Sequence, residues 1–342
     1  MLEEAKINFY RVHKCGYYHR AKDIPEFGQV ASMLVELKAW AFDAKKPLAE
    51  TCTYELDDEG TILHTYCFDM KALGNGDVIL TTWNETETLD GGMASVNGSD
   101  PAGSANVNTT AVPPGHIPGY PTYFWFIPSH NAFVTLRFDQ RANGHAGLRL
   151  LLSDFLAKFT THVAYGPPND DGEELIIGYR EKPKDKPQRL TPSFKSNPER
   201  LPGPLEFLRK NRTKIKKVIR KDVLSPQNQD DRTLWQRFCH NLGITNSPQL
   251  TSEVKLKAEL PFTPSKEELK EIIDEWESEI NSKWNDVGFE MSGEEDIKWL
   301  SHTLVKAKLD LDVTRDSKGV ISVDSIADAV TTHRAVLLGM LV

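Results

Sequence analysis

The fold is decided by one stretch, Ile62-Leu-His-Thr-Tyr-Cys-Phe-Asp-Met-Lys-Ala-Leu-Gly-Asn-Gly-Asp-Val-Ile-Leu-Thr-Thr-Trp83. Two runs rich in β-branched and aromatic residues flank Gly74-Asn-Gly-Asp77, a sequence typical of a tight turn. A turn this short can join only antiparallel strands. The stretch therefore predicts a β-hairpin with strands from Ile62 to Met70 and from Val78 to Trp83.

Further strands are expected on both sides of this hairpin, and together they form an antiparallel meander. They are Lys6 to Val12, Thr51 to Leu56, Tyr123 to Ile127 and Ala132 to Phe138. Apolar residues at helical spacing predict two helices, Phe27 to Asp43 and Gly147 to Phe159. Residues 88–119 are rich in Gly, Ser, Asn, Thr and Pro and show no periodicity, which indicates a mobile or functional segment.

The last hundred residues alternate strands and helices. Val254 to Leu260 and Val305 to Val313 each alternate apolar and polar residues, as a strand with one buried face does. Ser265 and Ser292 each begin a capping box (a Glu follows three residues later), so each predicts a helix start. The second of these helices is expected to continue through Leu304. The apolar end of the chain, residues 335–342, must pack in its own core or in a partner's.

These patterns predict an α+β protein in three parts. Residues 1–170 form an N-terminal antiparallel sheet with helices, residues 171–250 form a basic, proline-rich connecting region with helices, and residues 251–342 form a C-terminal α+β domain. No apolar run reaches the length of a membrane span, and the N-terminus lacks the pattern of a signal peptide, so we expect a cytoplasmic protein. The four cysteines form no Cys-x-x-Cys pair and are expected to be free thiols.

The charge of the chain is distributed unevenly. The chain has a formal net charge of −8, yet Tyr179 to Lys221 contains 15 Lys or Arg residues and four acidic residues. Such a concentration of positive charge is typical of proteins that bind a polyanion, most often a nucleic acid. Its densest part, Arg209 to Lys221, lies in a predicted helix from Leu205 to Val223. Lys210, Lys214, Lys217 and Lys221 would follow one flank of that helix.

We therefore expect sequence-tolerant binding of nucleic acid through phosphate contacts, with double-stranded DNA favoured over RNA. The candidate residues combine the cations of the basic helix with the lysines of the two alternating strands. They are Arg209, Lys210, Arg212, Lys214, Lys216, Lys217, Arg220, Lys221, Lys255, Lys257, Lys306 and Lys308. Phe194, Phe207 and Trp235 are candidates for stacking on bases. A homodimer would raise the avidity.

Four alternatives stay open for the basic region and its neighbours. The basic helix could instead pair with the acidic helix Glu267 to Glu279, or lie on a membrane surface. Asp170, Asp171 and Glu173, with Glu181 and Lys182, resemble the carboxylate–lysine arrangement of metal-dependent nucleases, although Glu181 and Lys182 are adjacent rather than separated by one residue. The acidic region 267–296 and the apolar tail could serve a protein–protein adaptor.

Recognised motifs of catalysis are missing from the sequence. It contains no phosphate-binding loop, no glycine fingerprint of a dinucleotide fold, no Gly-x-Ser-x-Gly and no pair of histidines at metal-binding spacing. We therefore expect no cofactor, no metal and no catalytic residue.

The order of these features resembles the RexA family of lambdoid phage exclusion proteins. The resemblance lies in an opening Lys-Ile-Asn-Phe-Tyr-Arg strand (6–11), Gly119-Tyr-Pro-Thr-Tyr-Phe-Trp-Phe126, Ala132-Phe-Val-Thr-Leu-Arg137 and Val254-Lys-Leu-Lys-Ala-Glu-Leu-Pro261. It implies a DNA-binding sensor, expected to be dimeric, that acts in prophage or antiviral defence with a separate membrane effector protein. The family supplies no catalytic residues.

Overall fold

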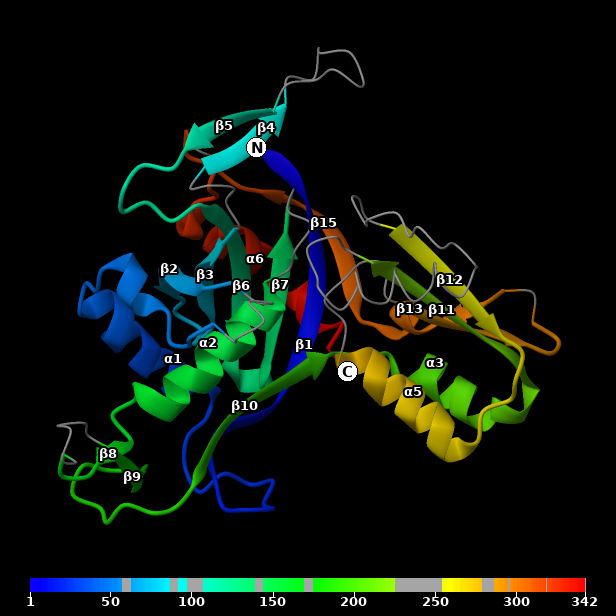
Figure 1. Ribbon diagram of the computed structural model, residues 1–342, viewed down its shortest axis with the longest axis horizontal. Coiled ribbons are helices and arrows are strands. Elements are labelled where there is room, and N and C mark those ends of the chain that lie inside the picture. The colour runs from blue at the N-terminus through cyan, green and yellow to red at the C-terminus, as the bar shows by residue number, and fades with distance from the viewer. Residues whose placement is uncertain are drawn as a thin grey trace, which may run out of the picture. The chain divides into compact units, whose positions relative to one another are not determined.

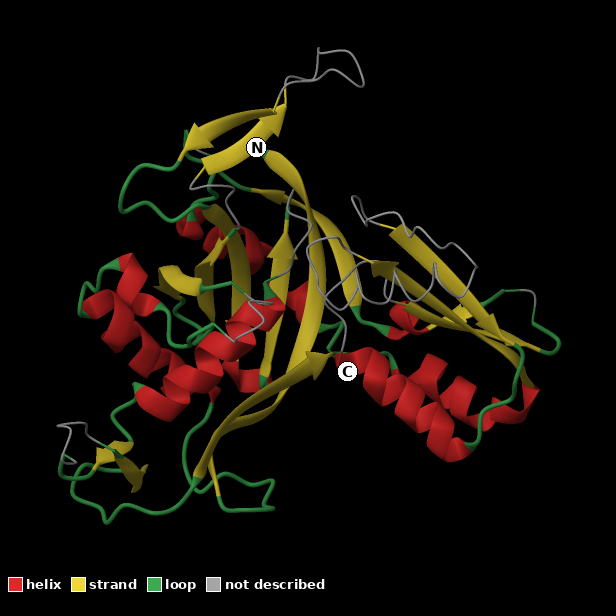
Figure 2. Ribbon diagram, viewed as in Figure 1, coloured by secondary structure: helices red, strands yellow, loops and turns green. Residues whose placement is uncertain are grey.

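The computed structural model divides the chain into two compact units, shown as ribbons in Figures 1 and 2. Unit 1 comprises Met1–Asn197 and Ala307–Gly339, and unit 2 comprises Pro198–Lys306 and Met340–Val342. The structure describes residues 1–56, 63–86, 92–96, 107–138, 144–168, 175–224, 254–278, 286–294, 296–317 and 319–341. Helices and antiparallel strands occur in both units, which confirms the predicted α+β class.

A seven-stranded sheet forms the centre of unit 1. Its order is β10-β1-β7-β6-β3-β2, and β15 also pairs with β1. The bounds are β1 Leu2–Tyr18, β2 Thr65–Ala72, β3 Val78–Glu85, β6 Gly119–Ile127, β7 Ala132–Arg137, β10 Thr191–Pro198 and β15 Lys306–Asp312.

The predicted hairpin is confirmed. Strands β2 and β3 pair antiparallel, with Ala72 opposite Val78 at the turn, where Gly76 takes a positive φ of 84° that favours glycine. The predicted strand from Thr51 to Leu56 is wrong. A short 3-10 turn, Leu48–Thr51, stands at its beginning, because the Thr51 hydroxyl donates back to the Leu48 carbonyl and closes a local turn.

Helices lie on both faces of this sheet, as Figure 1 shows for α2 in front and α6 behind. On one face lie α1 Val30–Leu37 and α2 His145–Lys158, which share a core with β1, β3, β6 and β7. Helix α1 continues as a π-helix, Lys38–Asp43. The other face meets α6 Val323–Leu338, which contacts β2 and β3. Two small hairpins, β4 Gly92–Val96 with β5 Val107–Ala111 and β8 Val163–Tyr165 with β9 Ile176–Tyr179, complete the strands described in unit 1.

Unit 2 is a four-stranded sheet of order β12-β11-β13-β14. The elements follow the chain as α3 Pro202–Lys210, β11 Ile215–Leu224, β12 Val254–Leu260, α5 Lys266–Ser278, β13 Asp286–Met291 and β14 Lys298–Trp299. Leu205 and Leu208 of α3 and Leu269, Ile273 and Trp276 of α5 share a core with residues of β11 and β13. Both helices therefore pack on one face of the sheet, as Figure 2 shows. The other face is called the outer face below.

One of the two predicted capping boxes is confirmed. The Ser265 hydroxyl accepts from the Glu268 backbone amide at 3.1 Å, and Glu268 accepts from the Ser265 amide at 2.6 Å. The helix predicted from Ser292 to Leu304 is wrong. Residues 298–299 pair with β13, and a 3-10 turn, Leu300–Thr303, follows. The edge of β13 provides backbone partners for β14, and this pairing replaces the local hydrogen bonds that a helix would make.

The unit boundaries differ from the three predicted parts. The C-terminal segment does not form one domain with β12 and α5, because β15 pairs with β1 and α6 packs on the sheet of unit 1. The predicted turn Asp316–Gly319 is confirmed by the hydrogen bond from the Asp316 amide to the Val320 carbonyl at 2.8 Å. Among the helices that the structure describes, none combines the length and apolar character needed to cross a membrane.

A buried ion pair fixes α6 to this sheet. The Asp77 side chain is 1% exposed and accepts from Arg334 of α6 at 2.7 Å and from the indole of Trp125 at 3.1 Å. Burial of a carboxylate without partners is costly, so these donors, together with the Asn75 side-chain amide at 3.3 Å, make Asp77 tolerable at this position. The pair connects Asp77, at the end of the hairpin turn, to α6, which begins at Val323, more than 240 residues later in the sequence.

We predict that Arg334→Met lowers the free energy of unfolding of unit 1 by about 3 kcal/mol, because Asp77 loses its cation but stays buried. The measurement is urea denaturation followed by fluorescence. Lys71→Met is the control, since Lys71 pairs with Asp324 between the same sheet and helix but in an exposed position. A much smaller loss is expected there. Equal losses in the two variants would contradict the role given to Asp77.

Candidate nucleic-acid interface

The predicted basic helix from Leu205 to Val223 is wrong. Helix α3 ends at Lys210, a 3-10 turn spans Arg212–Lys214, and β11 begins at Ile215. The strand is paired on both edges, with β12 and with β13, and it buries the β-branched side chains of Ile215, Val218 and Ile219. β-branched residues fit a pleated sheet better than a helix. The basic residues consequently do not share one helical flank.

The arginines of this segment hold α5 in place. Arg220 pairs with Asp222 of its own strand at 3.0 Å and with Glu275 of α5 at 3.4 Å. Arg212 donates to the Pro264 carbonyl, just before α5, at 2.6 Å. Pairing of the basic segment with the acidic helix, one of the alternatives left open by the sequence, is therefore realised for Arg220.

The outer face carries four of the predicted lysines. Val218 points into the core beneath α3 and α5, so Lys217 and Lys221 point to the outer face. Lys257 stands opposite Lys221, and Lys255 stands opposite Val223, so these two lysines of β12 share that face. The strand β12 is at the edge of the sheet, and Lys255 and Lys257 are exposed.

A single carboxylate neutralises two of these lysines. Glu259 lies 2.8 Å from Lys217 and 2.6 Å from Lys257, and Lys217 also contacts Glu290 at 3.1 Å. The hydrogen bond from Lys217, followed by the one from Lys257, lowers the pKa of Glu259 to about 2. A lowered carboxylate pKa means that the ion pairs are intact above the ordinary value of 4.5 and are lost only as the pH falls toward 2.

Trp299 of β14 lies beside Lys221, one of the other two lysines of this face. The Lys221 ammonium is 3.7 Å from the centroid of the indole, a distance that places it over the ring face. Beneath the ring lies Gly288 of β13, where a Cβ would come within 2.8 Å of Trp299 Cε3 and 2.6 Å of Ile297 Cγ2. The absence of a side chain at Gly288 therefore allows the Trp299 indole to pack against the sheet.

Sequence reasoning missed Trp299. The predicted helix from Ser292 hid it, and no local signal links Trp299 to Lys221, because the two residues are 78 positions apart in the sequence. Of the stacking candidates that were predicted, Phe194 is buried and Phe207 is exposed. Trp235 lies outside the described residues.

The other candidate cations fall into two groups. Arg209, Lys214 and Lys216 are exposed, and none of them forms an ion pair within the part of the chain that the structure describes. Lys210 has a weak partner one helical turn earlier, Glu206, at 3.5 Å. Lys306 and Lys308 belong to β15, which pairs with β1 rather than with the sheet of unit 2. Lys308 lies 3.4 Å from Glu4 there, whereas Lys306, which belongs to unit 2, donates to the Ser301 carbonyl at 3.2 Å.

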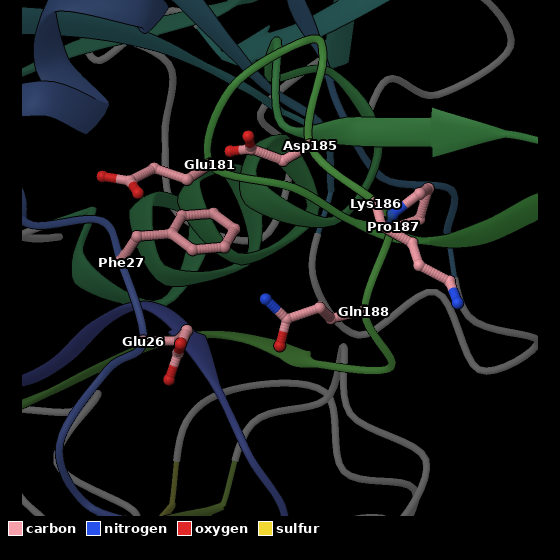
Figure 3. Close-up of a pocket in the computed structure, with 7 residues that line it drawn as sticks. All are labelled: Glu26, Phe27, Glu181, Asp185, Lys186, Pro187 and Gln188. Atoms are coloured by element: carbon pink, nitrogen blue, oxygen red, sulfur yellow. The ribbon is translucent and has the colours of Figure 1, made fainter.

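A separate hollow in unit 1, of about 540 Å³, has the opposite charge. Glu26, Glu181 and Asp185 line it together with Lys186, Phe27, Pro187 and Gln188. Figure 3 shows the Phe27 ring with Glu181 on one side and Glu26 on the other. Three carboxylates against one ammonium repel phosphate, so this hollow is a poor place for a nucleic acid.

Only part of the carboxylate group predicted for a metal-dependent nuclease lies within the described residues. Asp170, Asp171 and Glu173 lie outside the described residues, and Glu181 lines the hollow. Within the described ranges, no three His, Cys, Asp or Glu side chains are grouped so that they could hold a metal ion. The adaptor hypothesis relied on the apolar tail, of which Leu337 is buried and Val336 is exposed.

We predict that Lys217→Met raises the pKa of Glu259 from about 2 toward its ordinary value of 4.5, because the variant removes the first of its two donors. An NMR titration of the glutamate side-chain carboxyl carbons measures this shift. Lys221→Met removes an equal charge from the same face but from a residue that contacts Trp299, so the pKa of Glu259 should stay low. An unchanged Glu259 in the Lys217 variant would contradict the shared ion pair.

Comparison with known proteins assigns no family to this geometry. The chain matches no protein-family model, no curated protein and no solved structure. The functional argument therefore depends on the residues and contacts described above.

Proposed function

We propose that the chain binds nucleic acid through unit 2, without strong sequence preference. The observation that carries the proposal is the exposed cluster of Arg209, Lys214 and Lys216 at the junction of α3 and β11. Within the described part of the chain, these three cations have no carboxylate partner. Cations without counter-charges repel one another and destabilise the folded protein. Bound phosphates neutralise them and remove this repulsion.

The lysines of the outer face extend this cluster along β11 and β12. Lys217 and Lys257 are held by Glu259, but exposed ion pairs contribute little to stability. A phosphate can therefore replace Glu259 as their partner at small cost. Contacts of this kind position a backbone and carry no sequence information, which fits a sequence-tolerant binder.

The resemblance to phage exclusion proteins supplies a biological setting for the proposal. In that setting the chain would be a cytoplasmic sensor that recognises nucleic acid and acts with a separate membrane effector. A homodimer would present the cationic cluster twice and gain avidity on a long polyanion. No catalytic step is needed for this role.

The proposal is tested with the double variant Lys214→Gln/Lys216→Gln. Binding of a fluorescent 20-base-pair duplex and of a 20-nucleotide dT strand is followed by anisotropy at several salt concentrations. We expect weaker binding and a shallower slope of log K against log salt, by about 1.8 for the duplex and about 1.4 for the dT strand, because each phosphate contact contributes about 0.9 and about 0.7 respectively.

The matched control is Lys182→Gln/Lys184→Gln, which removes two exposed lysines of unit 1 from the same basic stretch of sequence. It should leave the slope unchanged. The proposal fails if the wild-type protein binds neither probe at low salt. It also fails if both double variants lose affinity equally, since the charge would then act without a defined surface.

A further inference from the structure

We propose that the outer face of unit 2 binds a single-stranded nucleic acid, with one base stacked on Trp299 and the adjacent phosphates held by Lys221, Lys255 and Lys257. This inference depends on the proposed function and specifies its ligand. It departs from the expectation of double-stranded DNA that the basic run alone supports.

The first argument is the position of the indole. Trp299 extends from β14 across Gly288 of β13 to reach Lys221 of β11, because Gly288 stands between Trp299 and Ile219 in the register of the sheet. The ring thus spans neighbouring strands on the surface of the sheet. The indole is partly exposed, and its contact on one side is the mobile end of a lysine. A base can take the place of that ammonium, since every base offers a flat π-face.

The second argument is an unfavourable pair of like charges. Lys221 and Lys257 are direct cross-strand neighbours on β11 and β12. Like charges in that relation destabilise a sheet. In the structure the two ammonium groups turn to different partners, Trp299 and Glu259. A phosphate between them would relieve the repulsion and would release the indole face at the same time.

The other charges of the outer face indicate the path that a bound nucleic-acid strand takes across it. Glu259 and Glu290 surround Lys217, and Asp286, opposite Lys221 on β13, accepts from the Ser301 amide and hydroxyl at 3.0 and 2.6 Å. The acidic groups are thus concentrated near Lys217 or are engaged in hydrogen bonds. Lys255 and Lys257 extend the cationic side along β12, so the sugar–phosphate chain is expected to run from Trp299 toward Lys255.

Stacking on Trp299 selects a single strand over a duplex. In a duplex each base is paired and stacked between its neighbours, so its face is closed to a protein side chain unless the base is extruded. A single strand can turn its bases toward an aromatic ring while its phosphates meet lysines. The same outer face therefore gains a contact from a single strand that a duplex does not provide.

The test compares three fluorescent probes: a dT 20-mer, an abasic strand of equal length, and a 20-base-pair duplex. We expect the wild-type protein to bind the dT strand about 10-fold more tightly than the abasic strand, because an abasic strand has no base to stack on the indole. Trp299→Leu should remove that difference and leave duplex affinity within about twofold, whereas Trp299→Phe should retain most of it.

Gly288→Ala offers an independent variant, since a Cβ there displaces the indole without removing it. It should weaken binding of the dT strand more than binding of the abasic strand. Equal affinity of the wild-type protein for the dT and abasic strands overturns the inference, and this result needs no variant to fold. If all three probes bind and Lys214→Gln/Lys216→Gln weakens them equally, the proposed function stands without the stacking site. If no probe binds, the proposed function itself has failed.

Discussion

The pairing of β11 on both of its edges is the constraint on which the candidate site depends. A strand between two neighbours must send successive side chains to opposite faces, and it must bury its apolar residues against whatever covers one of them. The basic run is divided accordingly. Arg220 goes to the helical side and pairs with α5, while Lys217 and Lys221 go to the outer face. The cations of one run are thus divided between a contact with α5 and the outer face.

Neutralisation within the fold then decides which cations are available. Glu259 serves Lys217 and Lys257 together, and its lowered pKa of about 2 keeps its carboxylate charged at neutral pH. The exposed cations of the α3–β11 junction have no such partner among the described residues. The charge of this surface is therefore close to neutral around Glu259 and positive at the α3–β11 junction. Such an arrangement favours an extended anion over a compact one.

Local signals in the sequence identified the hairpin of β2 and β3, the helix α2 and the cap of α5, because each depends on neighbouring residues only. The β11 segment was misjudged for a physical reason. Ile215, Val218 and Ile219 have helical spacing, and a bulge between Ile215 and Lys217 disturbs the alternation that would have revealed a strand. Its partner β12 begins 30 residues after β11 ends, so no local pattern announces the pairing.

The candidate site shows the same limit. Its lysines could be predicted from composition, since a dense run of cations is visible without any structure. Trp299 could not be placed, because its position depends on Gly288 in another strand and on Lys221 in a third. The division of the chain into units was hidden as well, since β15 meets β1 across about 300 residues and only the folded sheet joins them.

That connection has a consequence for how the polypeptide is made. The two strands that flank unit 2 in the sequence, β10 and β15, both pair with β1. Because the chain is made from its N-terminal side onward, β1 is synthesised long before its neighbour β15, which follows only after all of unit 2. Until then β1 offers unmatched amides and carbonyls to any passing chain. A chaperone bound to the growing chain would protect this exposed strand edge until β15 has been synthesised. Early folding of unit 2 would bring β15 close to β1 as soon as it is made.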